Sequence, residues 1–368
     1  MNVLINYLGK SNSGPLIAYE MARGFAKRKD VNVYAILSKS VPNRIQWDKD
    51  ELFRKVVYID TYSNLIEALI NSILFLVKGK KILKSAFGGI EFDVVLNPMH
   101  HLWSSFVCEV YRSARVVSVC HDPVAHEGER HFETLLTRRL MAMSNDIIVL
   151  TRSFIPIVKE KYGLTEEHIF YMPHGILNTY GNNRGSVEWS PYHEKGWKFL
   201  FFGRIEKYKG VPVLIDAYLK LHSQLGNTEL VIAGKGDLEC PHVDLSTNCI
   251  SIINRYISDD EICRLFEDDK VIVVLPYLSA SQSGVVSIAV EFGNIVICSD
   301  TGGLREQLLD GHVGIFVRPG DSNDLYEKMH YIIRNEEEQE KQKELMKELR
   351  AMLNWEEIME KLTNDILS

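Results

Sequence analysis

The chain has 368 residues, of which 46% are hydrophobic and 25% are charged, a composition typical of a globular protein. Most single hydrophobic cores are smaller, so two domains are expected. A formal net charge of −7 argues against general nucleic-acid binding. The 6 cysteines form no C-x-x-C pair and no zinc-type spacing with histidine. With no signal-peptide pattern and no apolar run of membrane-spanning length, these features predict a cytoplasmic protein.

The first half of the chain alternates short apolar runs with helix-like stretches. Strands are predicted over residues 2–8, 31–37, 56–59, 94–97, 116–120, 147–150 and 168–172. Helices are predicted over residues 15–28, 65–84, 102–112, 129–143 and 153–162. Apolar strands that alternate with helices indicate a parallel sheet covered on both faces. We therefore predict an α/β, Rossmann-like domain over residues 1–180.

The first predicted turn from strand to helix reads GKSNSGP over residues 9–15. Gly9, Ser13 and Gly14 are its candidate binding residues, because glycines let a backbone approach phosphate closely. The turn matches neither G-x-G-x-x-G nor a Walker A sequence. A purely structural turn explains it equally well.

The stretch over residues 65–83 reads LIEALINSILFLVKGKKIL, with apolar side chains at helical spacing. Four lysines follow its apolar part: Lys78, Lys80, Lys81 and Lys84. One interpretation is an interfacial helix that faces anionic lipid. The other is a buried helix that ends in solvated lysines, and base rates for such helices favour it.

His121 directly follows the predicted strand 116–120, so we expect it at the carboxyl edge of the sheet, where such folds bind ligands. Its neighbours in sequence are Asp122, Pro123, His126, Glu127, Glu129 and His131. Three roles compete: a metal site, a structural turn anchored by Asp122 and Pro123, and substrate binding or general acid–base work. The histidines lack the spacing of known metal motifs, and the nearby carboxylates favour the third role.

Residues 178–197 are rich in Gly, Asn, Ser and Pro and are predicted to be a linker. The alternation then resumes, which predicts a second Rossmann-like domain over residues 195–350 and a ligand cleft between the two domains. Residues 336–350 are dense in Glu and Lys, so a solvated helix is expected there. Residues 355–368 are more amphipathic, and we expect that helix to pack back onto the first domain.

The stretch FFGRIEKYKG over residues 201–210 joins an apolar strand pattern to a helix pattern. Gly203 and Gly210 bracket Arg204 and Lys209 at this junction. Backbone N–H groups and the helix dipole favour an anion there, and the two cations add full positive charge. Arginine grips two phosphate oxygens at once, while lysine supplies a point charge. The pattern predicts a diphosphate clamp.

Further glycine turns follow later predicted strands. In AGKGD (233–237), Gly234 and Lys235 are candidate contributors to a nucleotide-binding wall, and a tight turn is the structural alternative. The segment 276–293 combines a small-residue loop with a helix start, an arrangement that exposes several N–H groups to phosphate. Its candidate binding residues are Gln282, Ser283, Gly284, Val285 and, farther along the helix, Glu291.

Together these segments resemble the family 4 retaining glycosyltransferases of the GT-B fold. The residues that carry the resemblance are FFGRIEKYKG (201–210), VIAGKGD (231–237), PYLSASQSGVVSIAVEFGNIVICSDTGGLREQL (276–308) and GIFVRPGD (314–321). The resemblance implies sugar transfer from a nucleotide-sugar to an acceptor hydroxyl with retained configuration, without metal or other cofactor. It implies that Arg204 and Lys209 neutralise the leaving diphosphate and that His121 lies near the donor sugar and the acceptor.

One feature departs from this family. The family commonly carries two glutamates eight positions apart before and within the helix that ends at Gly293, and here Ala280 and Ile288 occupy those positions. The chain instead resembles a subgroup with an S-Q-S-G-V loop. Glu291, about one turn farther along, is the candidate replacement for the ribose-binding glutamate.

We therefore predict a cytoplasmic, metal-independent hexosyltransferase-type enzyme that assembles cell-surface polysaccharide, such as capsule, O-antigen or exopolysaccharide. Its expected partners are a nucleotide-sugar donor and a glycan or lipid-linked acceptor, with peripheral contact to the inner membrane surface and no nucleic acid. The missing glutamates motivate an alternative, a catalytically silent GT-B protein that binds a nucleotide-sugar or a protein partner. A Rossmann oxidoreductase is a weaker alternative, because no G-x-G-x-x-G with a following acidic residue is present.

Overall fold

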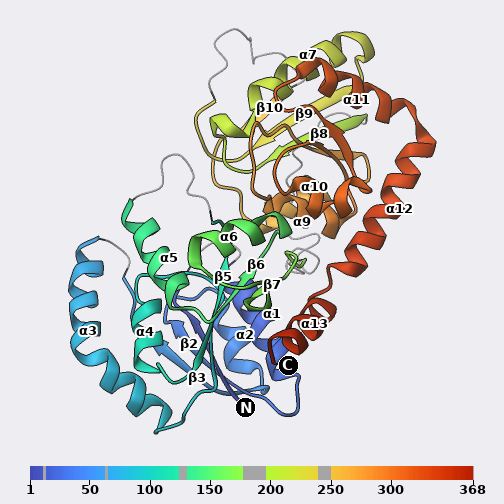
Figure 1. The fold of residues 1–368 in the computed structure, drawn as a ribbon. Coiled ribbons are helices and arrows are strands. Elements are labelled where there is room, and N and C mark those ends of the chain that lie inside the picture. Colours follow the sequence, from blue (N-terminus) through green and yellow to red (C-terminus); the bar gives the residue numbers. More distant parts are fainter. Residues whose placement is uncertain (11–13, 63–64, 124–130, 177–195, 239–249, 368) are drawn as a thin grey trace. The chain divides into compact units, whose positions relative to one another are not determined.

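The computed structural model describes residues 1–10, 14–62, 65–123, 131–176, 196–238 and 250–367 (Figure 1). Its internal contacts divide the chain into unit 1 (Met1–Pro173 with Trp355–Ser368) and unit 2 (His174–Asn354). Each unit contains a parallel β-sheet with helices packed on it, which confirms the predicted α/β class. Within the described residues, no helix combines the length and the apolar character that a bilayer-spanning segment needs. Most of the predicted linker, residues 177–195, lies outside the described ranges.

The described part of unit 1 is built on a seven-stranded parallel sheet with the order β3-β2-β1-β4-β5-β6-β7. The strands are β1 (Asn2–Tyr7), β2 (Asn32–Ser38), β3 (Phe53–Ile59), β4 (Val94–Asn97), β5 (Arg115–Cys120), β6 (Asp146–Val149) and β7 (Ile169–Tyr171). Val3 at the centre is in register with Val33 on one side and Val94 on the other. Side chains on both faces of the central strands are buried, which explains why these strands are apolar throughout.

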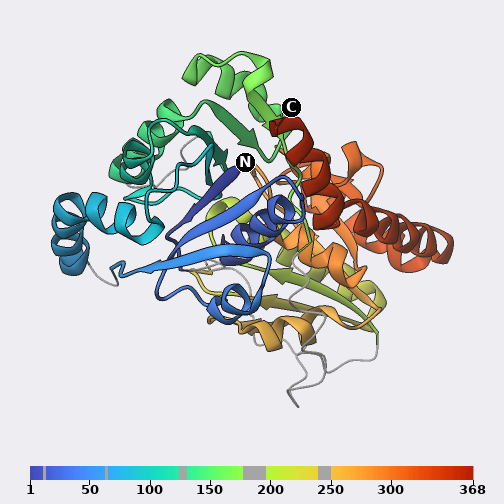
Figure 2. The ribbon, with the colours of Figure 1, turned by 90° about the horizontal axis from the view of Figure 1, so that it is seen from below.

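Helices pack on both faces of the unit 1 sheet (Figure 2). They are α1 (Gly14–Ala26), α2 (Arg44–Lys49), α3 (Leu65–Phe87), α4 (Ser104–Val110), α5 (His131–Met143), α6 (Ile155–Tyr162) and α13 (Trp355–Leu367), with short turns η1 (Arg152–Phe154) and η2 (Glu166–His168). Right-handed crossovers place α1 and α4 on opposite faces. Helix α13 packs against α1, while α3, α4 and α5 pack in a row. Arg115 anchors α13, because it pairs with the buried Asp146 and donates a hydrogen bond to Ile366 O at 2.7 Å.

Unit 2 contains a six-stranded parallel sheet within its described residues, in the order β10-β9-β8-β11-β12-β13. The strands are β8 (Trp197–Phe202), β9 (Thr228–Ala233), β10 (Ile250–Ile253), β11 (Val271–Leu275), β12 (Ile295–Ser299) and β13 (Ile315–Val317). Strand β8 lies between β9 and β11. The segments that follow these three strands therefore leave the sheet side by side at its carboxyl edge, where parallel sheets bind ligands.

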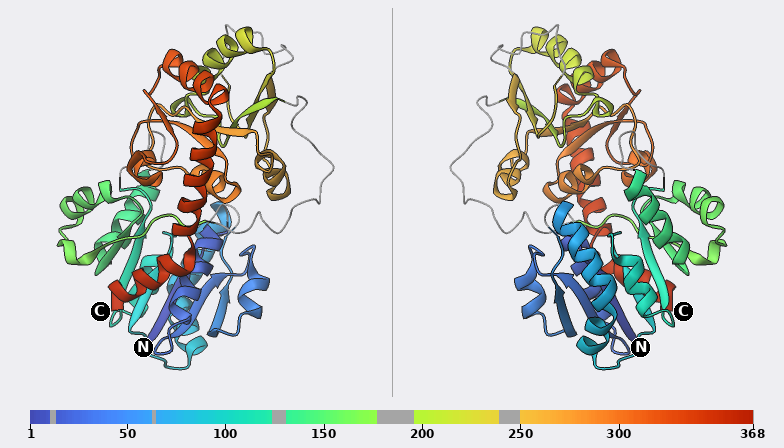
Figure 3. Two further views of the ribbon diagram at one scale, coloured as in Figure 1. Left: turned by 90° about the vertical axis from the view of Figure 1, so that its right-hand side faces the viewer. Right: turned by 90° about the vertical axis from the view of Figure 1, so that its left-hand side faces the viewer.

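Some helices of unit 2 lie between these strands in the chain, and the last two follow β13 (Figure 3). The helices are η3 (Lys207–Lys209), α7 (Val211–Leu225), α8 (Asp259–Phe266), α9 (Gly284–Phe292), α10 (Leu304–Gln307), η4 (Leu309–Gly311), α11 (Ser322–Arg334) and α12 (Glu336–Met352). Helix α7 packs against α11, and α9 packs against α8 and α12. The expectation of a fully solvated helix at residues 336–350 was wrong. One face of α12 is buried, and Gln342 on that face accepts a hydrogen bond from the backbone N–H of Gly314 at 2.8 Å.

Candidate functional site

The loops after β8 and β9 are joined by backbone hydrogen bonds at the carboxyl edge of unit 2. Gly203 N–H donates to Ala233 O at 3.0 Å, and Ile205 N–H donates to Lys235 O at 3.0 Å. Gly234 has a φ of +148°, and a Cβ at this position would lie 1.8 Å from Gly203 O. Only glycine fits at this position. The sequence analysis proposed Gly234 as part of a nucleotide-binding wall, and in the structure it allows the two loops to contact each other.

The start of α7 is held by a second close approach. Gly210 has a φ of +66°, and a Cβ there would lie 1.9 Å from Pro276 O in the segment after β11. Leu278 N–H donates to Tyr208 O at 2.8 Å, so the segment after β11 also binds η3 directly. The cation-bearing stretch 204–209 is therefore fixed at both ends by contacts that no side chain could replace.

Lys209 lies over an aromatic ring rather than against a carboxylate. Its Nζ is 3.6 Å from the ring centroid of Tyr277, a cation–π contact with a side chain that is fully buried. The pKa of Lys209 is lowered to about 8, mainly by burial and secondarily by the positive charge of Arg204, while Glu206 opposes the change. An anion bound beside Lys209 would oppose the effects of burial and of Arg204 by raising the pKa of Lys209.

Arg204 differs from Lys209 in its surroundings. Its side chain is 74% exposed and forms an ion pair with Glu206 at 2.9 Å. Exposed pairs of this kind contribute about 0–1 kcal/mol to stability, so Arg204 is not needed for the fold. The guanidinium also hydrogen-bonds the side chain of Tyr208, and a ligand would compete with these two contacts.

The amino terminus of α9 lies beside these cations. Ser283 caps the helix by accepting a hydrogen bond from Val285 N–H at 3.3 Å, and its Oγ also lies 3.1 Å from the hydroxyl of Tyr277. A Cβ on Gly203 would lie 3.9 Å from a methyl group of Val285. Tyr277 therefore contacts both Lys209 and the helix cap, which places cation and helix terminus at one point on the sheet edge.

Gln307, on α10, fixes the capping residue from the other side. Its side-chain oxygen accepts from Ser283 N–H at 2.8 Å, and its side-chain nitrogen donates to Ser283 O at 3.2 Å. Sequence reasoning missed both Tyr277 and Gln307. Tyr277 carried a weak signal as the polar aromatic directly after a strand and proline, whereas Gln307 carried none because its partner lies 24 positions away.

These observations place the predicted residues of unit 2 as follows. The loops after β8, β9 and β11 bring Gly203, Arg204, Lys209, Gly234, Lys235, Gln282, Ser283, Gly284 and Val285 to one sheet edge. Glu291 is different: it is only 3% exposed, lies in the last turn of α9, and its charge contributes after burial to the raised pKa of the Cys263 thiol on α8. Its proposed contact with ribose therefore gains no support from this placement and stays a hypothesis.

In unit 1, the predicted residues lie at the carboxyl ends of β1 and β5. A Cβ on Gly9 or Gly14 would meet the hydroxyl of the buried Tyr7 at 2.6 or 2.7 Å. His121 Nε2 lies 2.9 Å from Pro98 O, and because a carbonyl only accepts, Nε2 is the donor in this hydrogen bond. Ser13 lies outside the described residues, as do His126, Glu127 and Glu129.

Metal-ligating side chains do not gather in the part of the chain that the structure describes. There, no group of at least 3 His, Cys, Asp or Glu side chains is arranged to hold an ion. The cluster after His121 is only partly described, since residues 124–130 are outside the described ranges. Metal independence accordingly stays a prediction.

An aromatic cluster that the sequence analysis did not single out lies at the same edge of unit 1. The rings of His101 and Tyr62 stack with centroids 5.4 Å apart, and Trp103 lies edge-on to His101 at 5.7 Å. His101 Nδ1 accepts a hydrogen bond from Trp103 N–H at 3.2 Å. Burial lowers the pKa of His101 to about 4, with smaller contributions from His100 and Lys10, so its ring is neutral at physiological pH.

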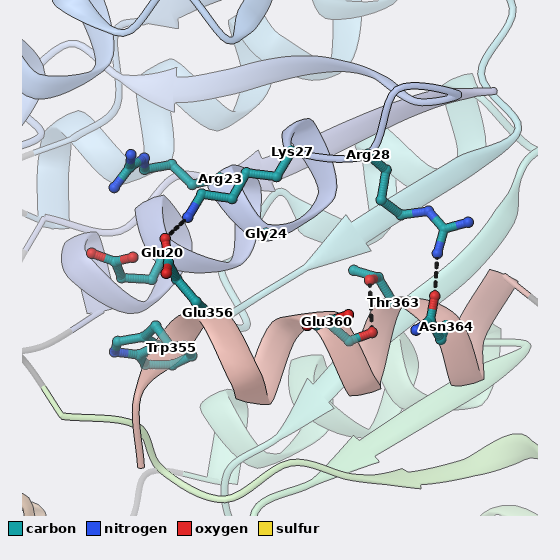
Figure 4. A pocket seen from close by; sticks show the side chains of 10 residues that line it. All are labelled: Glu20, Arg23, Gly24, Lys27, Arg28, Trp355, Glu356, Glu360, Thr363 and Asn364. Atoms are coloured by element: carbon teal, nitrogen blue, oxygen red, sulfur yellow. Dashed lines mark hydrogen bonds and ion pairs between the residues drawn. The ribbon is translucent and has the colours of Figure 1, made fainter. Parts of the chain in front are cut away.

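A hollow of about 410 Å³ lies along the seam between α1 and α13 (Figure 4). Two cations of α1 reach across to α13: Lys27 pairs with Glu356, and Arg28 donates to Asn364. A Cβ on Gly24 would lie 2.3 Å from Cβ of Met359, so the two helices touch at this point. The hollow is thus part of the packing that holds α13 on unit 1.

Two parallel α/β units, each with ligand-binding loops expected at the carboxyl edge of its sheet, are the architecture of the GT-B fold. The solved structure of HepE from Anabaena in complex with UDP and glucose has this fold, with a TM-score of 0.69 at 13% identity over 100% of this chain and 99% of that one. Residues 188–349 match the family model of glycosyl transferases group 1. This match falls within unit 2.

Two curated relatives match this chain in part. An uncharacterised glycosyltransferase of Methanocaldococcus jannaschii is 30% identical over 171 residues, which is 45% of this chain and 46% of the relative. The phosphatidyl-myo-inositol mannosyltransferase of Mycobacterium leprae is 29% identical over 151 residues, 39% of each chain. The chain thus spans less than half the length of the curated relatives that it matches.

Proposed function

We propose that the protein is a glycosyltransferase that moves a sugar from a nucleotide-diphosphate sugar to an acceptor hydroxyl. The observation that carries this proposal is a coincidence of two findings. The residues that match the group 1 glycosyltransferase model, 188–349, are those that contain the cations, the close glycine contacts and the capped helix of the sheet edge. A site of this composition suits a leaving diphosphate, whose charge grows as the bond to the sugar breaks.

In the proposed reaction, the bond between the anomeric carbon and the diphosphate oxygen breaks, and a bond from that carbon to the acceptor oxygen forms on the same face. Arg204 and Lys209 take up the charge that develops on the diphosphate, and the amino terminus of α9 adds its N–H groups. The hydroxyl proton leaves with the diphosphate or passes to the imidazole of His121. Retention of configuration is part of this proposal and follows the family resemblance.

The proposed acceptor is a glycan or a lipid-linked glycan of a cell-surface polysaccharide, and the proposed site of action is the cytoplasmic face of the membrane. Two similarities support a nucleotide-sugar donor and a lipid-borne acceptor: HepE was solved with UDP and glucose, and the Mycobacterium leprae relative is named for a phosphatidylinositol substrate.

Thermal denaturation in the presence of UDP, GDP or ADP tests the donor half of this proposal. A nucleotide at a hundred times its Kd should stabilise the native state by about 2.7 kcal/mol, and the matching nucleoside without phosphates should not. Slow hydrolysis of the corresponding nucleotide-sugar without acceptor would then separate an enzyme from the catalytically silent binder. If no nucleoside diphosphate raises the melting temperature, the donor site is wrongly assigned.

Exhaustive chelation tests the proposed metal independence. The clamp supplies positive side chains where metal-dependent enzymes use a cation, so EDTA followed by desalting should leave turnover unchanged. A stoichiometric zinc or manganese ion whose removal abolishes turnover, with recovery on re-addition, would contradict this part of the proposal.

A further inference from the structure

Helix α3 (Leu65–Phe87) has one buried face and one exposed face. Phe75, Gly79, Leu83 and Phe87 recur every fourth residue and are buried in unit 1. At about 100° per residue, the opposite side of the helix presents Ile70, Ile73, Leu74 and Val77. The sequence analysis offered a buried helix or an interfacial helix, and each describes only one side of α3. One side is buried in unit 1, and the opposite side exposes apolar side chains.

The exposed face of α3 carries an unusual share of apolar surface. Ile70 is 52% exposed, Ile73 55%, Leu74 48%, Leu76 61% and Val77 74%. Together with Ile82, these make 6 of the 15 exposed large hydrophobic side chains found among the described residues, and the others are scattered over the chain. Apolar side chains gathered in this way mark a contact surface rather than ordinary surface scatter.

Lysines continue the same exposed side of α3 toward its carboxyl end. Lys78, Lys80, Lys81 and Lys84 are all exposed, and Glu67 is the single acidic residue of the helix. Within the described ranges, none of these four lysines has a hydrogen-bond or ion-pair partner. This contrasts with the lysines of α12, of which Lys341, Lys343 and Lys347 each pair with a glutamate three positions earlier.

The buried face of α3 contacts the aromatic cluster at the carboxyl edge of the unit 1 sheet. Trp103 stacks on Phe75 with ring centroids 4.4 Å apart, and its indole N–H donates to Ser72 Oγ at 2.8 Å. Asn71 donates to Thr61 O at 3.2 Å, in the segment that follows β3. Whatever binds the outer face of α3 is thereby placed next to Tyr62 and His101.

We propose that the outer face of α3, residues 70–84, docks unit 1 on an anionic lipid surface. The apolar part of this face enters the boundary between head groups and acyl chains, and the four lysines meet lipid phosphates. The occupant is a lipid surface because apolar insertion followed by unpaired positive charge matches a negatively charged interface. This inference rests on the proposed function, since it identifies the surface that presents a lipid-linked acceptor to the edge holding His101 and His121.

Co-sedimentation of the full chain with phosphatidylcholine vesicles that contain or lack phosphatidylglycerol tests the proposal. The wild type should bind the anionic vesicles, and its binding should weaken as salt is raised. Changing Lys78, Lys80, Lys81 and Lys84 together to Gln should weaken binding by about a hundredfold or more, since each lysine contributes about fivefold. The pair Ile73→Asp and Val77→Asp should weaken binding by at least about tenfold, by placing charge in the apolar part.

A matched control changes as many lysines elsewhere: Lys341, Lys343, Lys347 and Lys361, on α12 and α13, to Gln. This variant should bind anionic vesicles like the wild type. Vesicle binding that falls equally in both lysine variants would reduce the effect to net charge and overturn the proposal. So would wild-type protein that stays in the supernatant, or a wild-type dimer that dissociates on Ile73→Asp, because α3 would then be a contact between two copies.

Nucleotide binding separates this inference from the proposed function. The α3 variants should keep the wild-type melting temperature and the wild-type shift with nucleoside diphosphate, because their changed side chains are exposed and lie in unit 1. Vesicle binding without any nucleotide shift would leave the docking surface in place and remove the donor assignment. A shift of the melting temperature with nucleotide, without vesicle binding, would keep the donor assignment and remove the docking surface.

Discussion

The carboxyl edges of the two sheets are built in different ways. In unit 2, loops meet backbone to backbone, with approaches of 1.8 Å and 1.9 Å to hypothetical Cβ atoms at Gly234 and Gly210. In unit 1, the corresponding edge is lined by side chains: the added Cβ of Gly9 or Gly14 would meet the Tyr7 side chain, and Tyr62, His101 and Trp103 form a cluster of rings.

This difference explains which half of the chain is recognisable. A backbone contact that only glycine allows requires glycine at that position, whereas an edge formed by side chains tolerates other residues that fill the same space. The family model accordingly matches residues 188–349, a range that falls within unit 2. Donor binding and acceptor binding, as proposed here, would then evolve under unequal constraint.

The largest expected effect concerns the cations of unit 2. Arg204→Ala and Lys209→Ala should each lower turnover by about a hundredfold or more, since one positioned donor to developing charge contributes about 3 kcal/mol. Thermal unfolding should confirm that the Arg204 variant remains folded, because that side chain is 74% exposed and its ion pair with Glu206 lies at the surface. His121→Ala in unit 1 is the matched control, and its affinity for nucleoside diphosphate should equal that of the wild type. Turnover within about threefold of wild type in both cation variants would remove the clamp assignment.

A pair of glycine substitutions tests the contrast between backbone and side-chain packing. Gly234→Ala should destabilise the protein by about 2–4 kcal/mol, since its Cβ would meet a carbonyl oxygen and its φ is positive. Gly9→Ala should cost about 1 kcal/mol, because the atom in the way is the end of the Tyr7 side chain. Urea denaturation at equal protein concentration measures both, and equal losses would show that the two edges are not built differently.

The pH dependence of nucleotide binding gives a smaller effect. Lys209 has a pKa of about 8, so below that pH it is charged and attracts the diphosphate, and above it the neutral form predominates. Calorimetry should show UDP affinity falling by up to about tenfold per pH unit from about pH 8 up to the pKa in the complex, which the bound phosphate raises above 8, and levelling off beyond it. Lys209→Arg, which keeps its charge, should flatten this profile. A wild-type profile that is already flat to pH 10 would contradict the role given to Lys209.

The smallest expected effect separates the two contacts of Tyr277. Tyr277→Phe keeps the ring beneath Lys209 and removes the hydroxyl beside Ser283, so nucleotide affinity should fall by only about threefold to tenfold. The pH profile should remain that of the wild type. Tyr277→Leu removes the ring as well and should also shift the pH profile. A profile displaced in the Phe variant would mean that the hydroxyl, not the ring, sets the pKa of Lys209.

The sequence predicted the alternation of elements, the parallel sheets and the cation-bearing turn at 203–210, because each depends on local pattern. The sequence did not predict the contact of Lys209 with Tyr277 or the hydrogen bonds between Gln307 and Ser283. Both contacts join residues on separate elements. The buried face of α12 was hidden because amides, rather than apolar residues, fill two of its buried positions. Glu291 was chosen by position along the helix, and periodicity alone could not show that it turns inward.

The docking of α13 on α1 has a consequence for synthesis of the chain. Helix α1 lies near the amino terminus and needs a helix that is translated more than 300 residues later, held by Arg115 and by the contact of Gly24 with Met359. Unit 2 comprises residues 174–354, which all leave the ribosome before residue 355. The unit that starts first therefore finishes last, and until then the side of α1 that α13 covers, around Gly24, lacks its partner helix.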